Sequence, residues 1–326
     1  MLRILKNALL SIVVIVVVFA GLAFFALWHA EPPMPTLSGQ VERGALQHDG
    51  RTRSWIAYVP TRPSSHPALI IVLHGSMGSG AQVRAHFGYD FDRLADQNGF
   101  IVVYPQGYDG HWNDCKKEGP FAAKRENIDD VGFLHALVDR LVIDHQVDRS
   151  QVYVTGVSNG GAMALRLALQ TPDFARAYAA VASSVPAPEN MAMTPANRPV
   201  SVLLMNGTDD PFNPWRGGDV VLYGVWGNRG PVLSTPASID YFRKLDGLDG
   251  APQLTPLPDR DPGDGCTVTR SLWTAPGKHS VALYTIQGGG HGLPHPATYG
   301  RRLLGHTNRD IHAADEIWGF FRAAGK

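Results

Sequence analysis

The stretch V-Y-V-T-G-V-S-N-G-G-A-M-A, residues 152–164, decides the fold of this 326-residue chain. It begins as a short β-branched strand, passes through a tight G-x-S-x-G turn and continues into an alanine-rich helix. On such a strand-to-helix turn the central residue, Ser158, stands clear of the sheet edge with its hydroxyl exposed. Gly156 and Gly160 permit the turn, because neither carries a side chain that would clash across it. The helix also points its free N–H groups toward Ser158, where negative charge would be stabilised.

Strands and helices alternate on both sides of this stretch. An alternating pattern predicts a strand at residues 53–60, and apolar runs predict buried strands at 68–73, 100–105, 200–205 and 281–286 besides the one at 152–157. Helices are expected at residues 87–98, 129–145, 236–245 and 310–324, and after Ser158. Runs that are apolar on both faces are typical of parallel strands covered by helices. The pattern therefore predicts an α/β fold, a mostly parallel central sheet with helices on both faces, in one domain over residues 41–326.

The N-terminal segment, residues 1–30, has the pattern of a membrane-targeting signal. Arg3 and Lys6 precede an apolar run over residues 8–28, which is long enough to span a hydrocarbon core. The run is followed by no good small-x-small cleavage site, so a signal anchor is the first interpretation and a cleaved signal peptide is the alternative. Residues 31–40 read as a Pro-rich linker. Both interpretations predict a body outside the cytoplasm, either periplasmic and held by a membrane helix or secreted.

Composition limits the possible partners. Hydrophobic residues make up 44% of the chain, and 29 basic residues balance 29 acidic ones. A large core is expected, and the balanced charge gives no reason to expect nucleic-acid binding. The sequence contains two cysteines, Cys115 and Cys266. Either one disulfide joins them or both are separately buried thiols, and the sequence leaves both possibilities open.

Polar residues that end the strands suggest the chemistry. Ser158 needs a base, because a serine hydroxyl alone is a poor nucleophile. His291 follows the strand at 281–286 in a glycine-rich loop, from which it could reach the serine. A carboxylate must then fix the imidazole tautomer, and Asp209 and Asp210 both follow the strand at 200–205. The order Ser, Asp, His along the chain is that of α/β hydrolases, and either aspartate fits it.

Two backbone N–H groups are expected to form an oxyanion hole. One belongs to Asn159, the residue after the nucleophile, and the other to Ser76, in the loop after the strand at 68–73. Such a site works by proton transfer and hydrogen bonding alone. We therefore expect no metal and no organic cofactor.

Several motifs together resemble those of the α/β-hydrolase esterases grouped with polyhydroxybutyrate depolymerases and feruloyl or acetylxylan esterases. The matching motifs are L-H-G-S at 73–76, W-N-D at 112–114, D-D-V-G-F at 129–133, Y-V-T-G-V-S-N-G-G at 153–161, N-G-T-D-D-P at 206–211 and G-G-G-H at 288–291. The resemblance covers nearly all of the chain after residue 45. It implies the α/β-hydrolase fold. It also implies that Asp210 is the triad acid, because the family pattern is G-T-x-D.

The chain departs from the family pattern at two places. Ser76 stands where the family usually has cysteine, which matters little because the backbone N–H binds the oxyanion. The sequence G-L-P at 292–294 replaces the usual T-W-P, which changes the expected acyl or alcohol pocket. We expect His74, Trp112 and Leu293 to line this pocket.

These observations predict a serine carboxylesterase that acts through an acyl-enzyme intermediate. The expected substrate is a small or oligomeric ester, such as a hydroxyalkanoate oligomer, a feruloyl ester or an acetyl ester. Two alternatives remain, a peptidase of the same fold and a non-catalytic binding protein at the cell surface.

Overall fold

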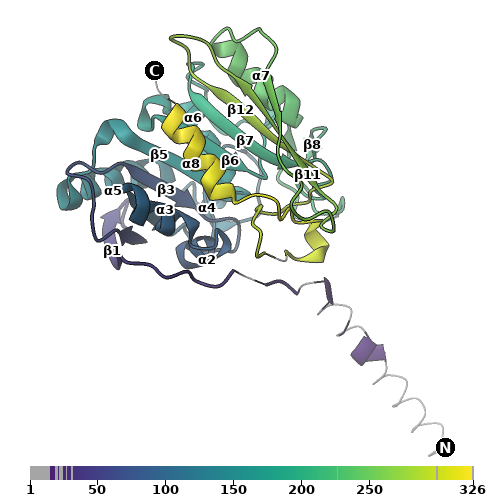
Figure 1. Cartoon of the computed structure of the whole chain (residues 1–326), viewed down its shortest axis with the longest axis horizontal. Helices are drawn as coiled ribbons and strands as arrows, with labels where there is room; N and C mark the ends of the chain where they lie inside the picture. Colours follow the sequence, from purple (N-terminus) through teal and green to yellow (C-terminus); the bar gives the residue numbers. More distant parts are fainter. Residues whose placement is uncertain are drawn as a thin grey trace, which may run out of the picture.

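The computed structural model describes residues 15–18, 21, 25–26, 28–30, 32–225, 227–298 and 300–324. Within these residues, ten strands form one sheet in the order β1-β2-β4-β3-β5-β6-β7-β12-β11-β10 (Figure 1). Their bounds are β1 Gln40–His48, β2 Arg51–Val59, β3 Leu69–Leu73, β4 Ile101–Pro105, β5 Val152–Val157, β6 Ala177–Val181, β7 Ser201–Gly207, β10 Gln253–Pro256, β11 Thr267–Trp273 and β12 Val281–Gln287. A separate ribbon pairs β8 (Gly218–Asp219) with β9 (Pro231–Val232).

The centre of the sheet is parallel. Strands β4, β3, β5, β6, β7 and β12 pair in parallel. Strands β1 and β2 at one edge, and β10 and β11 at the other, are antiparallel. The chain passes from β3 to β4 on one side, and β5 then lies on the other side of β3. Such a reversal of strand order is where α/β sheets bind ligands, at the carboxyl ends of the strands.

Two apolar layers cover opposite faces of the sheet. Alternate residues of β3 point to opposite faces, so Leu69 and Ile71 join one layer and Ile70 and Val72 join the other. The first layer contains α5, α6 and α7, and the second contains α2, α3 and α8, the yellow helix across the sheet in Figure 1. The helices are α2 Gly80–His86, α3 Asp90–Asn98, α4 Ala122–Arg125, α5 Asp130–His145, α6 Asn159–Gln170, α7 Thr235–Leu245 and α8 Ala313–Ala323, with 3-10 turns at Arg149–Gln151, Pro172–Phe174, Pro188–Asn190 and Arg302–Leu304.

The expected α/β fold class is confirmed, but four strands of the main sheet have no counterpart in the sequence analysis. The central strand β6 reads A-Y-A-A-V, and alanine gives little strand signal although every residue of it is buried. The strands β1, β10 and β11 lie toward the edges and are largely exposed or half-buried. Edge strands lack the continuous apolar run that marks a strand covered on both faces.

The helix expected at 87–98 begins later, as α3 at Asp90, and a helix that the sequence analysis did not predict, α2, ends at His86 just before a break. Gly88 and Tyr89 both have positive φ, 63° and 58°, which a continuing helix cannot accommodate. A Cβ on Gly88 would collide with the ring of His295, which comes from the far end of the chain. The break therefore makes room for a long-range contact that the local sequence does not reveal.

The disulfide considered between Cys115 and Cys266 is wrong, because both cysteines are free and buried. Cys115 packs in the apolar layer with α5 and α6, whereas Cys266 packs in the layer with α3 and α8 on the opposite face. Burial raises the pKa of each thiol to about 12, so both remain protonated at neutral pH.

The N-terminal signal predicted at 1–30 lies mostly outside the described residues. In the part of the chain that the structure describes, no helix is both long and apolar enough to cross a membrane. The end of the Pro-rich linker contacts the body: the backbone N–H of Ser38 donates to Asp96 and that of Gly39 donates to the Tyr58 hydroxyl, at 2.8 and 2.7 Å.

Candidate active site

Ser158 lies at the turn between β5 and α6 in a strained backbone conformation, with φ 55° and ψ −117°. A non-glycine residue rarely adopts positive φ, and such strain is typical of functional sites. The turn is closely packed: a Cβ on Gly156 would lie 2.5 Å from the carbonyl carbon of Gly160, and one on Gly160 would collide with the carbonyl of Leu73. The glycines are therefore required by the close approach of three backbone segments.

The structure brings Ser158, His291 and Asp210 together from the ends of three strands. Nε2 of His291 lies 2.9 Å from Oγ of Ser158, and Nδ1 lies 2.7 Å from Oδ2 of Asp210. The side chains of His291 and Asp210 are 10% and 0% exposed. The other oxygen of Asp210 accepts the backbone N–H groups of Phe212 and Asn213, at 2.7 and 2.8 Å. These bonds fix the carboxylate so that it faces the imidazole.

Asp209 does not share this position. Its Oδ1 accepts the hydroxyl of Thr208 at 2.9 Å, on the exposed side of the turn. Of the two aspartates that the sequence offered as partners for His291, the geometry therefore selects Asp210.

The two segments expected to form an oxyanion hole both lie next to Ser158. Asn159 begins α6 directly after the serine. The loop after β3 also reaches the serine, since a Cβ on Gly75 would lie 3.6 Å from Cβ of Ser158. The hydroxyl of Ser76 is buried and has no hydrogen-bond partner among the described residues.

The side chain of Asn159 is held by the W-N-D motif. Its Oδ1 accepts the backbone N–H of Trp112 at 2.7 Å, and its Nδ2 donates to the Trp112 carbonyl at 3.1 Å and to Oδ2 of Asp114 at 2.7 Å. Three hydrogen bonds therefore fix the first residue of α6 against the segment at 112–114.

The expected pocket residues His74, Trp112 and Leu293 require a correction. They are 1%, 0% and 8% exposed, and the described residues that line the cavity beside Ser158 include none of them. His74 donates from Nδ1 to the Gly75 carbonyl, accepts the Gly107 N–H at Nε2, and has its pKa lowered to about 4 by burial. Trp112 donates its indole N–H to the His74 carbonyl at 3.0 Å. His74 and Trp112 therefore support the loops around the site, and Leu293 packs in the apolar layer with α3 and α8.

A buried charge cluster lies next to Asn159 at the start of α6. The sequence motifs did not predict this cluster. Asp114 is fully buried between two lysines, with Nζ of Lys116 at 2.9 Å and Nζ of Lys124 at 3.1 Å. Burial opposes the ionisation of Asp114, but the two lysines hold its pKa well below the usual range. The local sequence D-C-K-K gave no sign of it, because lysines are almost always exposed.

The cavity beside Ser158 is lined by Ser158, His291, Lys116, Phe212, Asn213 and Arg229, among others. The ring of Phe212 meets that of His291 edge to face, with centroids 5.2 Å apart. The guanidinium of Arg229 lies 4.6 Å from the centre of the same Phe212 ring. Both Phe212 and Arg229 come from the segment at 212–235, which follows β7.

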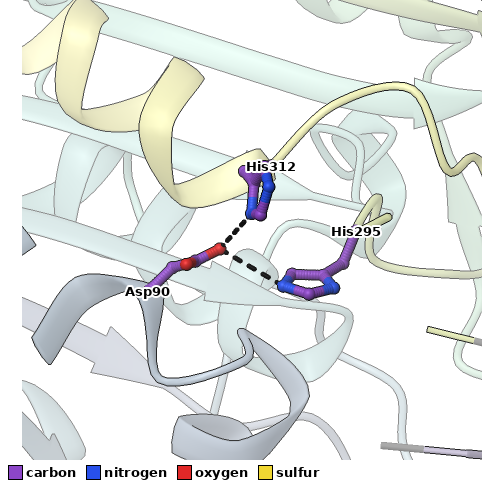
Figure 2. Close-up of side chains that lie close together, drawn as sticks. All are labelled: Asp90, His295 and His312. Atoms are coloured by element: carbon purple, nitrogen blue, oxygen red, sulfur yellow. Dashed lines mark hydrogen bonds and ion pairs between the residues drawn. The ribbon is translucent and has the colours of Figure 1, made fainter. Parts of the chain in front are cut away.

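A second polar cluster lies outside the cavity residues, where Asp90, His295 and His312 offer three potential metal ligands within 4.8 Å of one another (Figure 2). Oδ2 of Asp90 is 2.6 Å from Nδ1 of His312 and 3.3 Å from Nε2 of His295. His295 accepts the Ala297 N–H at Nδ1, so its proton lies on Nε2 and points to Asp90. A metal would require both rings to give up the protons that these contacts use. The cluster acts as a hydrogen-bonded link between α3 and the chain on either side of the 3-10 turn before α8.

The parallel sheet, the strained serine and its two partners define an α/β hydrolase. The solved acetyl xylan esterase from Aspergillus awamori has a similar fold, with a TM-score of 0.54 at 15% identity, over 86% of this chain and 99% of that one. The pattern of the family described as "Esterase PHB depolymerase" matches residues 54–197. The chain belongs to this esterase family, and its activity is hydrolysis of ester bonds.

Relatives of known name extend the match over most of the chain. The protein named "Putative esterase NocK" of Nocardia uniformis subsp. tsuyamanensis is 31% identical over 281 residues, which is 83% of this chain and 79% of the relative. An acetylxylan esterase of Coprinopsis cinerea is 25% identical over 288 residues, which is 82% of this chain and 73% of the relative. The family resemblance that the sequence motifs predicted is confirmed.

Proposed function

We propose that this esterase is a serine carboxylesterase in which Ser158 is the nucleophile, His291 the general base and Asp210 the residue that orients the base. The observation that supports the proposal is the continuous contact from Ser158 Oγ to His291 Nε2, at 2.9 Å, and from His291 Nδ1 to Asp210, at 2.7 Å. This is the arrangement of a nucleophile, a base and an orienting acid.

The proposed reaction has two steps. Ser158 Oγ attacks the ester carbonyl while its proton passes to Nε2 of His291, and the imidazolium then protonates the leaving alcohol. Water next attacks the acyl-enzyme with His291 again as the base, which releases the acid and regenerates the serine. Asp210 keeps the His291 proton on Nδ1 and stabilises the imidazolium, because two backbone N–H groups prevent it from turning away.

The backbone N–H groups of Asn159 and Ser76 are the proposed oxyanion hole. The clamp of Trp112 and Asp114 on the Asn159 side chain supports this role, since it fixes the start of α6 beside the serine. One such donor typically contributes about 3 kcal/mol to transition-state stabilisation.

The proposed substrate is an ester of a carboxylic acid, of the acetyl, feruloyl or hydroxyalkanoate kind. Relatives named acetylxylan esterase, feruloyl esterase B and poly(3-hydroxyalkanoate) depolymerase C support this range. We also infer that the catalytic body lies outside the cytoplasm. That inference rests on Arg3, Lys6 and the apolar run that follows them.

The test combines a reactive probe with a substrate panel. The full chain is treated with a fluorophosphonate probe and assayed on p-nitrophenyl acetate, a hydroxybutyrate oligomer, methyl ferulate, acetylated xylan and a peptide anilide. The expected result is labelling and ester hydrolysis that both vanish in Ser158→Ala. Labelling with turnover of the anilide alone would favour a peptidase. A folded protein that neither reacts with the probe nor hydrolyses an ester would favour a binding protein.

A further inference from the structure

The cavity beside Ser158 has an unusual charge balance. Lys116 and Arg229 both line it, and the described residues around it include no carboxylate of Asp or Glu. The two side chains come from segments far apart in the sequence, the W-N-D-C-K-K segment and the segment at 212–235. Both residues are more than nine-tenths buried, at 5% and 8% exposed.

Lys116 has a carboxylate partner, whereas Arg229 has none among the described residues. Lys116 pairs with Asp114, which Lys124 also contacts and to which Asn159 donates a hydrogen bond. One buried negative charge therefore faces the positive charges of two lysines before Arg229 is counted. Among the described residues, no carboxylate forms an ion pair with Arg229, and its buried Nε has no hydrogen-bond partner.

A buried guanidinium without a counter-ion is costly, and it cannot escape the cost by losing its proton. Burial lowers the pKa of Arg229, but arginine stays charged at any physiological pH. The rings of Phe212 and Phe121, 4.6 and 5.6 Å from the guanidinium, compensate part of the lost hydration through cation–π contacts. They leave the Nε–H donor unpaired, and such a donor would form a strong charge-assisted hydrogen bond with a carboxylate.

We infer that Arg229 binds an anionic group of the substrate, so the enzyme prefers esters that carry a carboxylate near the ester bond. This inference rests on the proposed function, because it concerns the substrate of the Ser158 site. The ring of Phe212 contacts both the imidazole of His291 and the guanidinium of Arg229. The carboxylate of the substrate would therefore be separated from His291 by only the ring of Phe212. Lys116 adds positive potential from the other segment.

The experiment compares esters that differ only in charge. On the acyl side, 4-methylumbelliferyl hydrogen glutarate is paired with the neutral glutaramate ester. On the alcohol side, 4-carboxyphenyl acetate is paired with 4-carbamoylphenyl acetate. The full chain is assayed at pH 7.5, and Ser158→Ala provides the blank for spontaneous hydrolysis. In at least one pair, kcat/KM for the carboxylate is expected to exceed that for the amide by about tenfold to a hundredfold.

Three variants test whether Arg229 causes the preference. Arg229→Gln should bring the carboxylate-to-amide ratio close to one, and Arg229→Lys should retain part of the preference. Arg216→Gln is the matched control, because Arg216 is an exposed arginine in the same segment and its loss changes the net charge equally. The control should keep the wild-type ratio. Thermal unfolding of each variant checks that it is folded.

The outcomes separate this inference from the proposed function. Ser158-dependent turnover of the amide esters with no carboxylate preference in either pair would overturn the anion site alone, and so would a preference that survives in Arg229→Gln. If Arg229→Gln does not fold, the anion site is tested by the carboxylate-to-amide ratios of the wild type and of Arg229→Lys. No turnover of any of the four esters by the folded protein would overturn the proposed function and the anion site with it.

Discussion

Replacing Asp114 by asparagine should strongly destabilise the protein. The carboxylate is 0% exposed and lies 2.9 and 3.1 Å from two lysine side chains that are each 6% exposed. The amide introduced by Asp114→Asn would keep the shape and an acceptor for Asn159 while it removes the negative charge. Two buried ammonium groups would then lack a counter-ion, and removal of one partner from a buried pair costs about 3–5 kcal/mol.

The measurement is urea unfolding of the full chain, with Asp173→Asn as the control. Asp173 also pairs with an arginine, Arg198, but these side chains are 76% and 57% exposed, so its loss should cost about 0.5 kcal/mol or less. The loss in Asp114→Asn should shrink as pH rises toward the lysine pKa, because the neutral amine is easier to bury. Burial already lowers the pKa of Lys124 in the native protein.

A loss below about 1 kcal/mol in Asp114→Asn would refute this reasoning, since it would mean that water or relaxation neutralises the cluster. A second comparison uses Lys116→Met and Lys124→Met together. In that background the cations are absent, so Asp114→Asn should no longer destabilise the protein. An unchanged loss in that background would show that the cost does not arise from the unpaired lysines.

Three further predictions concern the catalytic contacts, the turn and the polar cluster. Asp210→Asn should lower kcat by about 10⁴-fold while Asp209→Asn leaves it nearly unchanged, and equal effects on p-nitrophenyl acetate hydrolysis would contradict the choice of aspartate. Gly160→Ala should destabilise the fold, because the new Cβ would collide with backbone atoms. Gly319→Ala, with no atom of a described residue near its Cβ, should instead stabilise α8 by up to about 1 kcal/mol. The melting temperatures of the two variants test both expectations. The hydrogen bond to Asp90 raises the pKa of His312, so its stabilisation is present below about pH 6.5 and is lost as pH rises through the raised pKa. His312→Gln should therefore lower the melting temperature more at pH 5.5 than at pH 8.5, and a pH-independent difference would contradict the assignment. The loss in free energy of unfolding at pH 5.5 should exceed that at pH 8.5 by less than about 1 kcal/mol, because this site is partly exposed.

The sequence predicted the positions of Ser158, His291 and the aspartate pair because their signals are local. Each follows an apolar strand, and parallel strands bring their carboxyl ends to one edge of the sheet. The choice between Asp209 and Asp210 needed geometry, or the family pattern, because neighbouring residues differ in direction rather than in type. Only Asp210 turns toward the imidazole.

Ion pairs between residues far apart in the sequence could not be predicted from local sequence patterns. Asp129 and Asp130 lie together at the start of α5, and Asp129 caps the helix by accepting the N–H of Gly132 at 2.9 Å. Asp130 instead is buried and pairs with Arg53, 77 residues earlier in the chain, at 2.5 Å. An acid at a helix start gives the same sequence signal in both roles, so only the position of Arg53 beside this helix distinguishes them.

Sequence motifs also do not distinguish residues that contact a substrate from residues that hold the contacting residues in place. Trp112 belongs to a family motif, yet it is fully buried and holds Asn159 and His74 through hydrogen bonds. Arg229 belongs to none of the motifs and lines the cavity. The proposed reaction therefore depends on residues at strand ends, whereas the segment at 212–235 supplies side chains that would select the ester. Since the two depend on different parts of the chain, a change at Arg229 could alter substrate preference while Ser158, His291 and Asp210 keep their contacts.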